Sequence, residues 1–274
     1  MNQRVTPNRG PALLDSVAGR LTTAVGAAFP GERAVFRGQD IHQSLADMNW
    51  VGMLALGITG RKLPATHLQL LESIWVFTSY PDSRIWNNRV AALAGSARSS
   101  GNLGVSGALA VSEAYIYGRQ NEYQASSFFI NTVKARAAGV PLQQCIDEEM
   151  AQHGRIAGYG RPLANADERI APTMQLAREL GLADGPHVAL AFELEQHLVA
   201  TGKPLRMNYG ALVSAFGADL GFSPREYYHF LYPSFLAGML PCYIEAADKP
   251  EGTLFPTACS AIQYQGPPPR DWGK

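Results

Sequence analysis

Apolar side chains recur every three or four residues along most of the chain, the spacing that places them on one face of an α-helix. Proline and glycine residues flank these stretches, where helices commonly begin and end. The pattern predicts helices at 44–59, 65–79, 85–99, 103–117, 125–138, 142–153, 167–180, 187–200 and 225–236. No long stretch alternates apolar and polar residues, as a sheet would require. We therefore expect an all-α fold with roughly ten helices.

Small residues follow one another on neighbouring turns of the predicted helix at 103–117, namely Gly104, Gly107, Ala108 and Ala110. Small side chains allow a second helix to approach closely, at some cost in helix propensity. Two interpretations remain open. The stripe packs against another helix of the same chain, or it forms the interface of a dimer.

Composition narrows the class of protein. Among the 274 residues, 23 are basic and 23 acidic, so the net charge is zero, which argues against a broad surface for nucleic acid or anionic membrane. No apolar run approaches the ~20 residues of a membrane span, and the N-terminus lacks the apolar core of a signal peptide. Three scattered cysteines and six histidines without ligand spacing predict neither disulfides nor a metal. We expect a soluble, cytoplasmic protein.

Five segments, taken in chain order, resemble segments of the citrate synthase and citryl-CoA lyase superfamily. They lie at 35–41, 45–64, 158–169, 207–224 and 264–267. The third begins Gly158-Tyr159-Gly160-Arg161 and continues to Arg169, and is similar to the family's Gly-aromatic-Gly-His followed by Asp-Pro-Arg. The chain length suits the compact citryl-CoA lyases better than the longer citrate synthases.

The resemblance implies a citrate-synthase-like bundle of many helices, built as a dimer. It implies an N-terminal segment at 1–30, a helical domain at 31–265 with a smaller mobile part at roughly 121–222, and a proline-rich tail at 266–274. It also implies that an acyl-CoA thioester is the substrate, with no bound cofactor and no metal.

The chemistry of that family needs a carboxylate base, histidines that polarise carbonyl oxygens and arginines that hold carboxylates. Several of these positions differ here. Gly210 stands at the position of the aspartate, Tyr117 and Arg161 stand at or near histidine positions, and Phe235 replaces an arginine. Two further departures lie at 79–82, where a histidine is expected, and at Phe255, where an arginine is expected. Ordinary citrate synthesis or citryl-CoA cleavage is therefore not expected.

The remaining residues predict a rebuilt site. Tyr117, Arg161 and Asn208 are the candidate catalytic residues, since tyrosine, arginine and asparagine side chains can donate hydrogen bonds to an oxyanion. The candidate substrate-binding residues are Gly158, Tyr159, Gly160, Arg169, Arg119, Tyr209 and Phe235. Structural alternatives stay open: an interface aromatic at Tyr117, an exposed loop charge at Arg161, and a helix N-cap at Asp167.

Two classes of function follow. The first is an enzyme that forms or cleaves a C–C bond beside an acyl-CoA thioester. The second is a non-catalytic subunit of the same fold with a structural or regulatory role. The expected partners are a small acyl-CoA or carboxylate ligand and either a second copy of the chain or an active paralogue. A third alternative is an unrelated all-helical protein.

Overall fold

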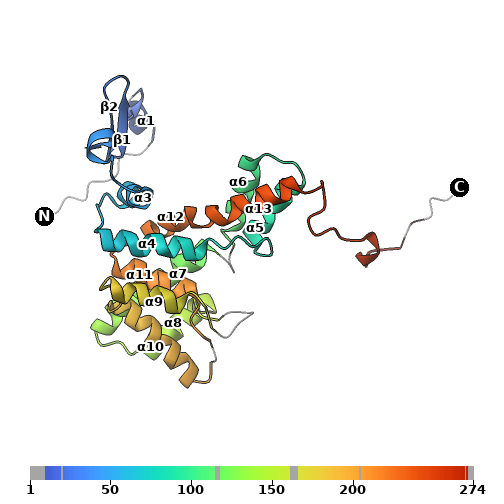
Figure 1. The fold of residues 1–274 in the computed structure, drawn as a ribbon. Coiled ribbons are helices and arrows are strands. Elements are labelled where there is room, and N and C mark those ends of the chain that lie inside the picture. Colours follow the sequence, from blue (N-terminus) through green and yellow to red (C-terminus); the bar gives the residue numbers. More distant parts are fainter. Residues whose placement is uncertain are drawn as a thin grey trace. The chain divides into compact units, whose positions relative to one another are not determined.

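A computed structural model of the chain describes residues 10–19, 21–114, 118–160, 166–203, 205–268 and 270. The chain packs as two compact units, one up to Pro64 and the other from Ala65 onward. Helices make up most of the regular structure (Figure 1). The expected all-α class is therefore confirmed.

The first unit contains a small sheet that the sequence pattern did not predict. Its elements are α1 (Pro11–Val17), β1 (Gly26–Phe29), β2 (Arg33–Phe36), β3 (Gln39–Asp40), α2 (Ile41–Ser44) and α3 (Trp50–Thr59). The three strands pair in chain order and antiparallel. Strands this short cannot display the long alternation by which a half-buried strand is recognised, which is why the expectation of no strands was wrong here.

Side chains of the hairpin contact the backbone of α3 at Gly57. A Cβ atom added at Gly57 would lie 2.6 Å from the Phe36 ring, so only glycine allows this approach. The Arg37 Nε donates a hydrogen bond of 3.0 Å to the Gly57 carbonyl. The Asp40 carboxylate accepts from the amides of His42 and Gln43 and so caps α2.

The second unit consists of helices. They are α4 (Ala65–Thr78), α5 (Trp86–Ser96), α6 (Gly101–Val111), α7 (Arg119–Ala137), α8 (Leu142–His153), α9 (Ile170–Glu179), α10 (Pro186–Ala200), α11 (Tyr209–Asp219), α12 (Pro224–Leu231) and α13 (Leu236–Asp248), with 3₁₀ turns η1 (Tyr232–Phe235) and η2 (Cys259–Ala261). The predicted capping box is present at the start of α12. Beyond η2 the described tail has no regular element.

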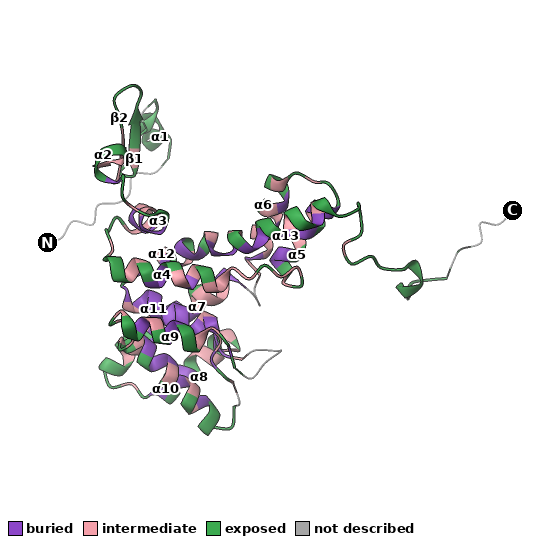
Figure 2. Ribbon diagram, in the orientation of Figure 1, coloured by how far each residue is buried: buried purple, intermediate pink, exposed green. Residues whose placement is uncertain are grey.

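The core of the second unit is centred on α11. Almost every residue of this helix is buried, and it packs against α7, α10 and α12 (Figure 2). Packing against α11 therefore brings together helices that are far apart in the sequence. A helix buried on all sides is expected to be apolar throughout. The polar side chains of Asn208 and Asp167 at its N-terminus therefore call for an explanation.

Helices α5, α6 and α13 form a second group of packed helices. A Cβ atom at Gly104 would lie 2.7 Å from that of Ala94 on α5, and Ala108 belongs to a buried cluster with Ala91 and Met239. Gly104 and Ala108 are thus used for packing within one chain, whereas Ala110 is exposed. This is the first of the two interpretations of that stripe.

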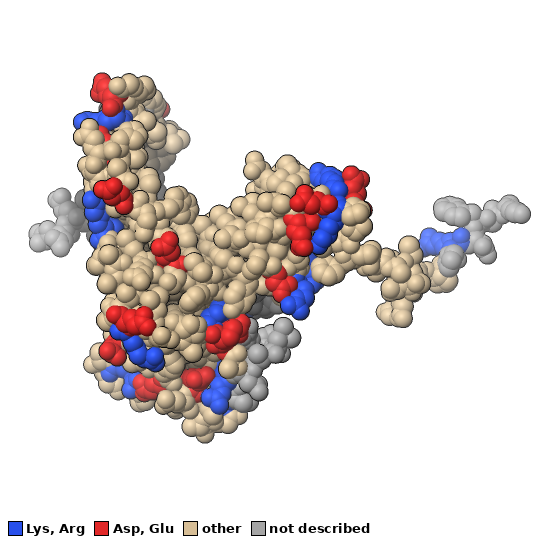
Figure 3. All heavy atoms as spheres, viewed as in Figure 1, with Lys and Arg blue, Asp and Glu red and all other residues tan. Residues whose placement is uncertain are grey.

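Positive and negative side chains are interspersed on the face shown in Figure 3. Of the helices in the described part of the chain, none is long and apolar enough to cross a membrane. A mobile part at roughly 121–222 stays a prediction, as do the boundaries of the N-terminal segment and the tail.

Candidate functional site

The glycine-rich segment is held beside the start of α11 by backbone pairing. Tyr159 and Met207 form an antiparallel bridge, and the Asn208 amide donates to the Gly158 carbonyl at 2.9 Å. Gly158 has a φ of 87°, and a Cβ atom there would lie 2.6 Å from that of Ala211. Both facts require glycine. Two of the segments that carry the resemblance therefore meet in space.

Several predicted site residues maintain this pairing. The Asn208 Oδ1 accepts from the Gly210 amide at 2.9 Å, as an N-cap, and its Nδ2 donates to the Gly160 carbonyl at 3.2 Å. The Tyr159 hydroxyl donates to the Ala191 carbonyl at 2.7 Å, and burial raises the pKa of this tyrosine far above its usual range. The side chains of Asn208 and Tyr159 are thus engaged with the protein itself.

Asp167 and Arg169 form an ion pair that also reaches α11. Both Arg169 Nε and Nη2 donate to the Asp167 carboxylate at 2.8 Å, and the Tyr209 amide donates to it at 2.9 Å. Helix α9 begins at Ile170, and the carboxylate is buried. The N-cap of α9 is Arg169 and not Asp167, whose carboxylate accepts from the Arg169 amide and from the N-terminus of α11.

Arg169 lies between two aromatic rings. Its guanidinium carbon is 4.5 Å from the centre of the Tyr209 ring and 5.4 Å from that of Tyr80. The Tyr209 hydroxyl is 3.0 Å from Thr173 Oγ1, and burial raises the pKa of this tyrosine above its usual range. The Arg169 side chain is 21% exposed, and no described residue accepts a hydrogen bond from its Nη1. One edge of the guanidinium can therefore bind an anion.

Arg119 is the second arginine of the site and is almost completely buried, with 2% of its surface exposed. It is the first residue of α7, and its Nη2 donates to Ser234 Oγ at 2.6 Å. Its guanidinium lies 4.0 Å above the centre of the Phe235 ring. The structure thus brings the predicted residues Arg119 and Phe235 together, so the phenylalanine supports an arginine supplied by another helix.

Glu122 completes this cluster and was not among the predicted residues. Its Oε1 lies 3.7 Å from Arg119 Nη1, and also 3.7 Å from the place of a Cβ atom on Gly210. Burial raises the pKa of Glu122, and the charges of Arg119 and Arg169 offset part of this effect. The sequence signal was the spacing of Arg119, Glu122 and Ser126, which puts polar residues on the buried face of α7.

Not every predicted residue can be placed in this cluster. Tyr117 and Arg161 lie outside the described residues, so their roles stay predictions. At the 79–82 segment, the Tyr80 hydroxyl donates to Glu168 at 3.1 Å. Phe255 is 57% exposed, with Arg89 over its ring, and is not part of the buried cluster.

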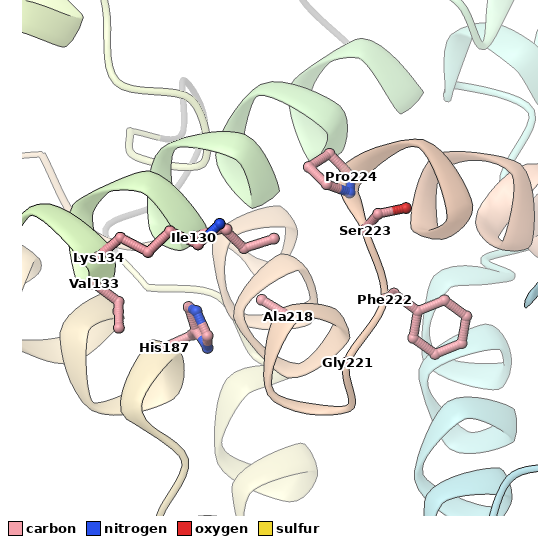
Figure 4. Close-up of a pocket in the computed structure, with 9 residues that line it drawn as sticks. All are labelled: Ile130, Val133, Lys134, His187, Ala218, Gly221, Phe222, Ser223 and Pro224. Atoms are coloured by element: carbon pink, nitrogen blue, oxygen red, sulfur yellow. The ribbon is translucent and has the colours of Figure 1, made fainter. Parts of the chain in front are cut away.

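A separate surface pocket of about 470 Å³ opens between α7, α10 and the start of α12 (Figure 4). Its lining residues are Ile130, Val133, Lys134, His187, Ala218, Gly221, Phe222, Ser223 and Pro224. Beside it, Asp219 accepts hydrogen bonds from the amides of His187 and Val188, so its carboxylate caps α10. None of the predicted site residues lines this pocket.

Neither a known family profile nor a curated protein sequence matches this chain. Solved structures do match. The citryl-CoA lyase of Hydrogenobacter thermophilus has a TM-score of 0.80 and 19% identity, covering 92% of this chain and 97% of that one. An ATP citrate lyase of Methanosaeta concilii, in complex with (3S)-citryl-CoA, has a TM-score of 0.73 and 18% identity over 97% of this chain and 47% of that one.

A citrate synthase is also similar, though less closely. The enzyme of Thermotoga maritima has a TM-score of 0.57 and 19% identity, covering 82% of this chain and 59% of that one. The match to the citryl-CoA lyase extends over nearly the whole of both chains, so the fold is shared along almost all of this chain. The resemblance in the five sequence segments is confirmed at the level of the fold. The chain has the fold of the citryl-CoA lyases and citrate synthases.

Proposed function

We propose that this chain binds an acyl-CoA thioester and acts on a C–C bond next to the thioester carbonyl, as a lyase or synthase with a rebuilt site. Two arginines, Arg119 and Arg169, would hold the anionic groups of the ligand. Tyr117, Arg161 and Asn208 remain the proposed catalytic residues, with the loop at 158–160, Tyr209 and Phe235 around them.

The observation that carries this proposal is a buried cluster of charged side chains at the N-terminus of α11. Arg119, Glu122, Asp167 and Arg169 gather around the N-terminus of α11, and two of them are arginines within the electrostatic reach of one carboxylate. Burying this many charges costs free energy unless each is paired or serves a ligand. The similar ATP citrate lyase was solved with (3S)-citryl-CoA, which supports a CoA thioester as the ligand class.

Arginines at this place would act as donors to developing negative charge. Cleavage or formation of a bond beside a thioester places charge on the carbonyl oxygen as an enolate. A guanidinium held in position before the reaction stabilises that charge without reorganisation. Arg169 offers its Nη1 edge, and Arg119 is fixed by Ser234 and Phe235.

The second candidate is a non-catalytic subunit with the same fold, alone or with an active paralogue. One observation favours it: the amide of Asn208 and the hydroxyls of Tyr159 and Tyr209 all bind protein atoms. Side chains occupied in this way hold the loop in place. On this alternative the arginines would bind a ligand without turnover.

The two candidates are separated by measuring binding and turnover on the same preparation. Thermal unfolding with CoA, acetyl-CoA and citryl-CoA tests binding, since a ligand at 100 times its Kd adds about 2.7 kcal/mol to the stability. Mass spectrometry after incubation with several acyl-CoA thioesters, citryl-CoA among them, and with keto acids as partners then tests for turnover. Binding with turnover supports the lyase or synthase, and binding without turnover supports the subunit. The proposal is wrong if neither CoA, acetyl-CoA nor citryl-CoA raises the melting temperature of the protein.

A further inference from the structure

We propose that Glu122 is the general base of this site. Its carboxylate, supplied by α7, would take the role of the carboxylate that is missing at Gly210 at the start of α11. This assignment rests on the proposed function. It adds the residue that would move a proton at the α-carbon of the bound thioester.

Geometry supports the assignment first. Helices α7 and α11 pack side by side, and the Ser214 Oγ donates to the Glu122 carbonyl at 3.2 Å. A Cβ atom built on Gly210 would lie 3.1 Å from Asn208 Oδ1 and 3.7 Å from Glu122 Oε1. An aspartate at 210 would therefore extend its carboxylate into the space that the Glu122 carboxylate already fills. A glycine at 210 leaves that space to Glu122.

The hydrogen bonding of this carboxylate is incomplete. Its Oε2 is buried and has no hydrogen-bond partner among the described residues. Its Oε1 is 3.7 Å from Arg119 Nη1, beyond the length of a hydrogen bond. Buried polar atoms are almost always satisfied, so an orphaned carboxylate oxygen calls for an explanation. A proton donor supplied by a ligand would satisfy it.

The electrostatic surroundings raise the basicity of this carboxylate above that of an exposed glutamate. Burial is the main cause that raises the pKa of Glu122, and the carboxylate of Glu113 adds to it. Arg119, the backbone amide of Glu122 itself and Arg169 oppose this rise, and the charge of Glu122 in turn acts on the Tyr227 hydroxyl of α12. A base is most effective when its pKa is near the working pH.

The proposed step is a single proton transfer. A Glu122 oxygen takes the α-proton of the thioester, the electron pair of the broken C–H bond forms the double bond between the α-carbon and the carbonyl carbon, and the π pair of the carbonyl group moves onto its oxygen. The product is an enolate paired with a neutral Glu122 carboxylic acid. In the reverse direction the carboxylic acid returns the proton to the α-carbon.

Deuterium exchange into the methyl group of acetyl-CoA tests this step, because exchange needs the base and no second substrate. The wild-type protein in D₂O is expected to exchange these protons, and the loss of the methyl signal is measured by NMR. Glu122→Gln, which keeps the shape of the side chain, should slow exchange by on the order of 100-fold or more. Its Kd for acetyl-CoA should stay close to that of wild type, since the arginines are unchanged.

A second test moves the carboxylate from position 122 on α7 to position 210 on α11. Glu122→Ala empties the space beside Gly210, and the double variant Glu122→Ala/Gly210→Asp fills it again from α11. The double variant should exchange faster than Glu122→Ala alone. Glu72→Gln, at an exposed glutamate of α4, is the control and should exchange like wild type.

Each result is decisive. If wild type binds none of CoA, acetyl-CoA and citryl-CoA, the proposed function and the Glu122 assignment both fall, and if it binds CoA or citryl-CoA but not acetyl-CoA, only the Glu122 assignment falls. If wild type binds acetyl-CoA without exchange, or if Glu122→Gln exchanges as fast as wild type, the Glu122 assignment is wrong and thioester binding stands. A double variant no faster than Glu122→Ala contradicts the shared position of the two carboxylates.

Discussion

At the scale of single residues, Asp167 connects the parts of the candidate site. Its carboxylate accepts hydrogen bonds from the Arg169 guanidinium and from the Tyr209 amide. Burial alone would raise its pKa, but the bonds and charge of Arg169, together with the Tyr209 amide, hold the pKa of Asp167 below its usual value. The stability that this carboxylate contributes is therefore present above the unfolded pKa and is lost as the pH falls through the folded one.

Asp167→Asn should destabilise the protein by about 3 kcal/mol at neutral pH, since it leaves Arg169 with a weaker acceptor in a mostly buried place. Urea unfolding measures the change. Asp184→Asn, at an exposed aspartate, is the matched control and should stay within about 0.5 kcal/mol of wild type. Equal stability of the Asp167 variant and the control would show that the ion pair contributes nothing.

Glu122 has the opposite dependence on pH. Its raised pKa means that the folded chain keeps a proton which the unfolded chain has already released. The free energy of unfolding therefore falls as the pH rises from the usual range of a glutamate through the folded pKa of Glu122. A glutamine at this position does not ionise, so it removes this loss.

Glu122→Gln should be more stable than wild type at neutral pH, and the two should converge in acid, where Glu122 is protonated in both folded and unfolded chains. Urea unfolding at several pH values from acidic to neutral gives the comparison. Glu72→Gln, on the exposed side of α4, controls for the loss of one carboxylate. A Glu122 variant that is less stable than wild type at neutral pH would mean that its pairing with Arg119 outweighs the cost of burial.

At the scale of elements, close helix packing depends on two glycines in different ways. A Cβ atom at Gly95 of α5 would collide with the Tyr243 carbonyl oxygen of α13, whereas one at Gly107 of α6 would make an ordinary contact of 3.5 Å with Val90. Gly95→Ala should therefore cost about 1–3 kcal/mol through forced backbone movement. Gly107→Ala should gain up to about 1 kcal/mol in helix propensity. Thermal and urea unfolding of both variants check the contrast, and equal effects would contradict the packing of α5 on α13.

Most helices of the second unit could be predicted from apolar periodicity. The predicted range at 142–153 agrees with α8, and the range at 65–79 agrees with α4 to within one residue. The start of α7 was predicted six residues too late, at 125 instead of 119, because its first turn is polar. Helix α13 was missed because Pro241 lies inside it, and proline normally ends a helix.

The candidate site was predictable only in part, and the reason is physical. Gly158 and Arg169 lie within one segment, so a motif can reveal them. Glu122 and Gly210 belong to different helices, and their proximity depends on how α7 packs against α11. Periodicity places a residue on a helix face and does not tell which residue of another helix lies opposite. The same limit hid the contact between Arg119 and Phe235.

At the scale of the whole molecule, the expected homodimer needs an interface, and Gly104 and Ala108 of α6 are already buried against α5 and α13. Apolar side chains remain exposed on this group of helices. Leu103 on α6 is 70% exposed, and Leu240 and Ile244, one turn apart on α13, are 46% and 55% exposed. Exposed apolar residues that lie together mark surfaces for association, and two-fold pairing is the commonest form of oligomer.

We therefore predict a homodimer that buries Leu240 and Ile244. Light scattering at micromolar concentration should give twice the chain mass for wild type and the monomer mass for Leu240→Asp/Ile244→Asp, because paired acidic residues repel across a two-fold axis. Circular dichroism should remain helical in the variant, which separates dissociation from unfolding. Val76→Asp, at an apolar residue of α4 that is 63% exposed, is the matched control and should stay dimeric. A monomeric wild type would contradict the homodimer, and a variant that remains dimeric would place the interface on another face.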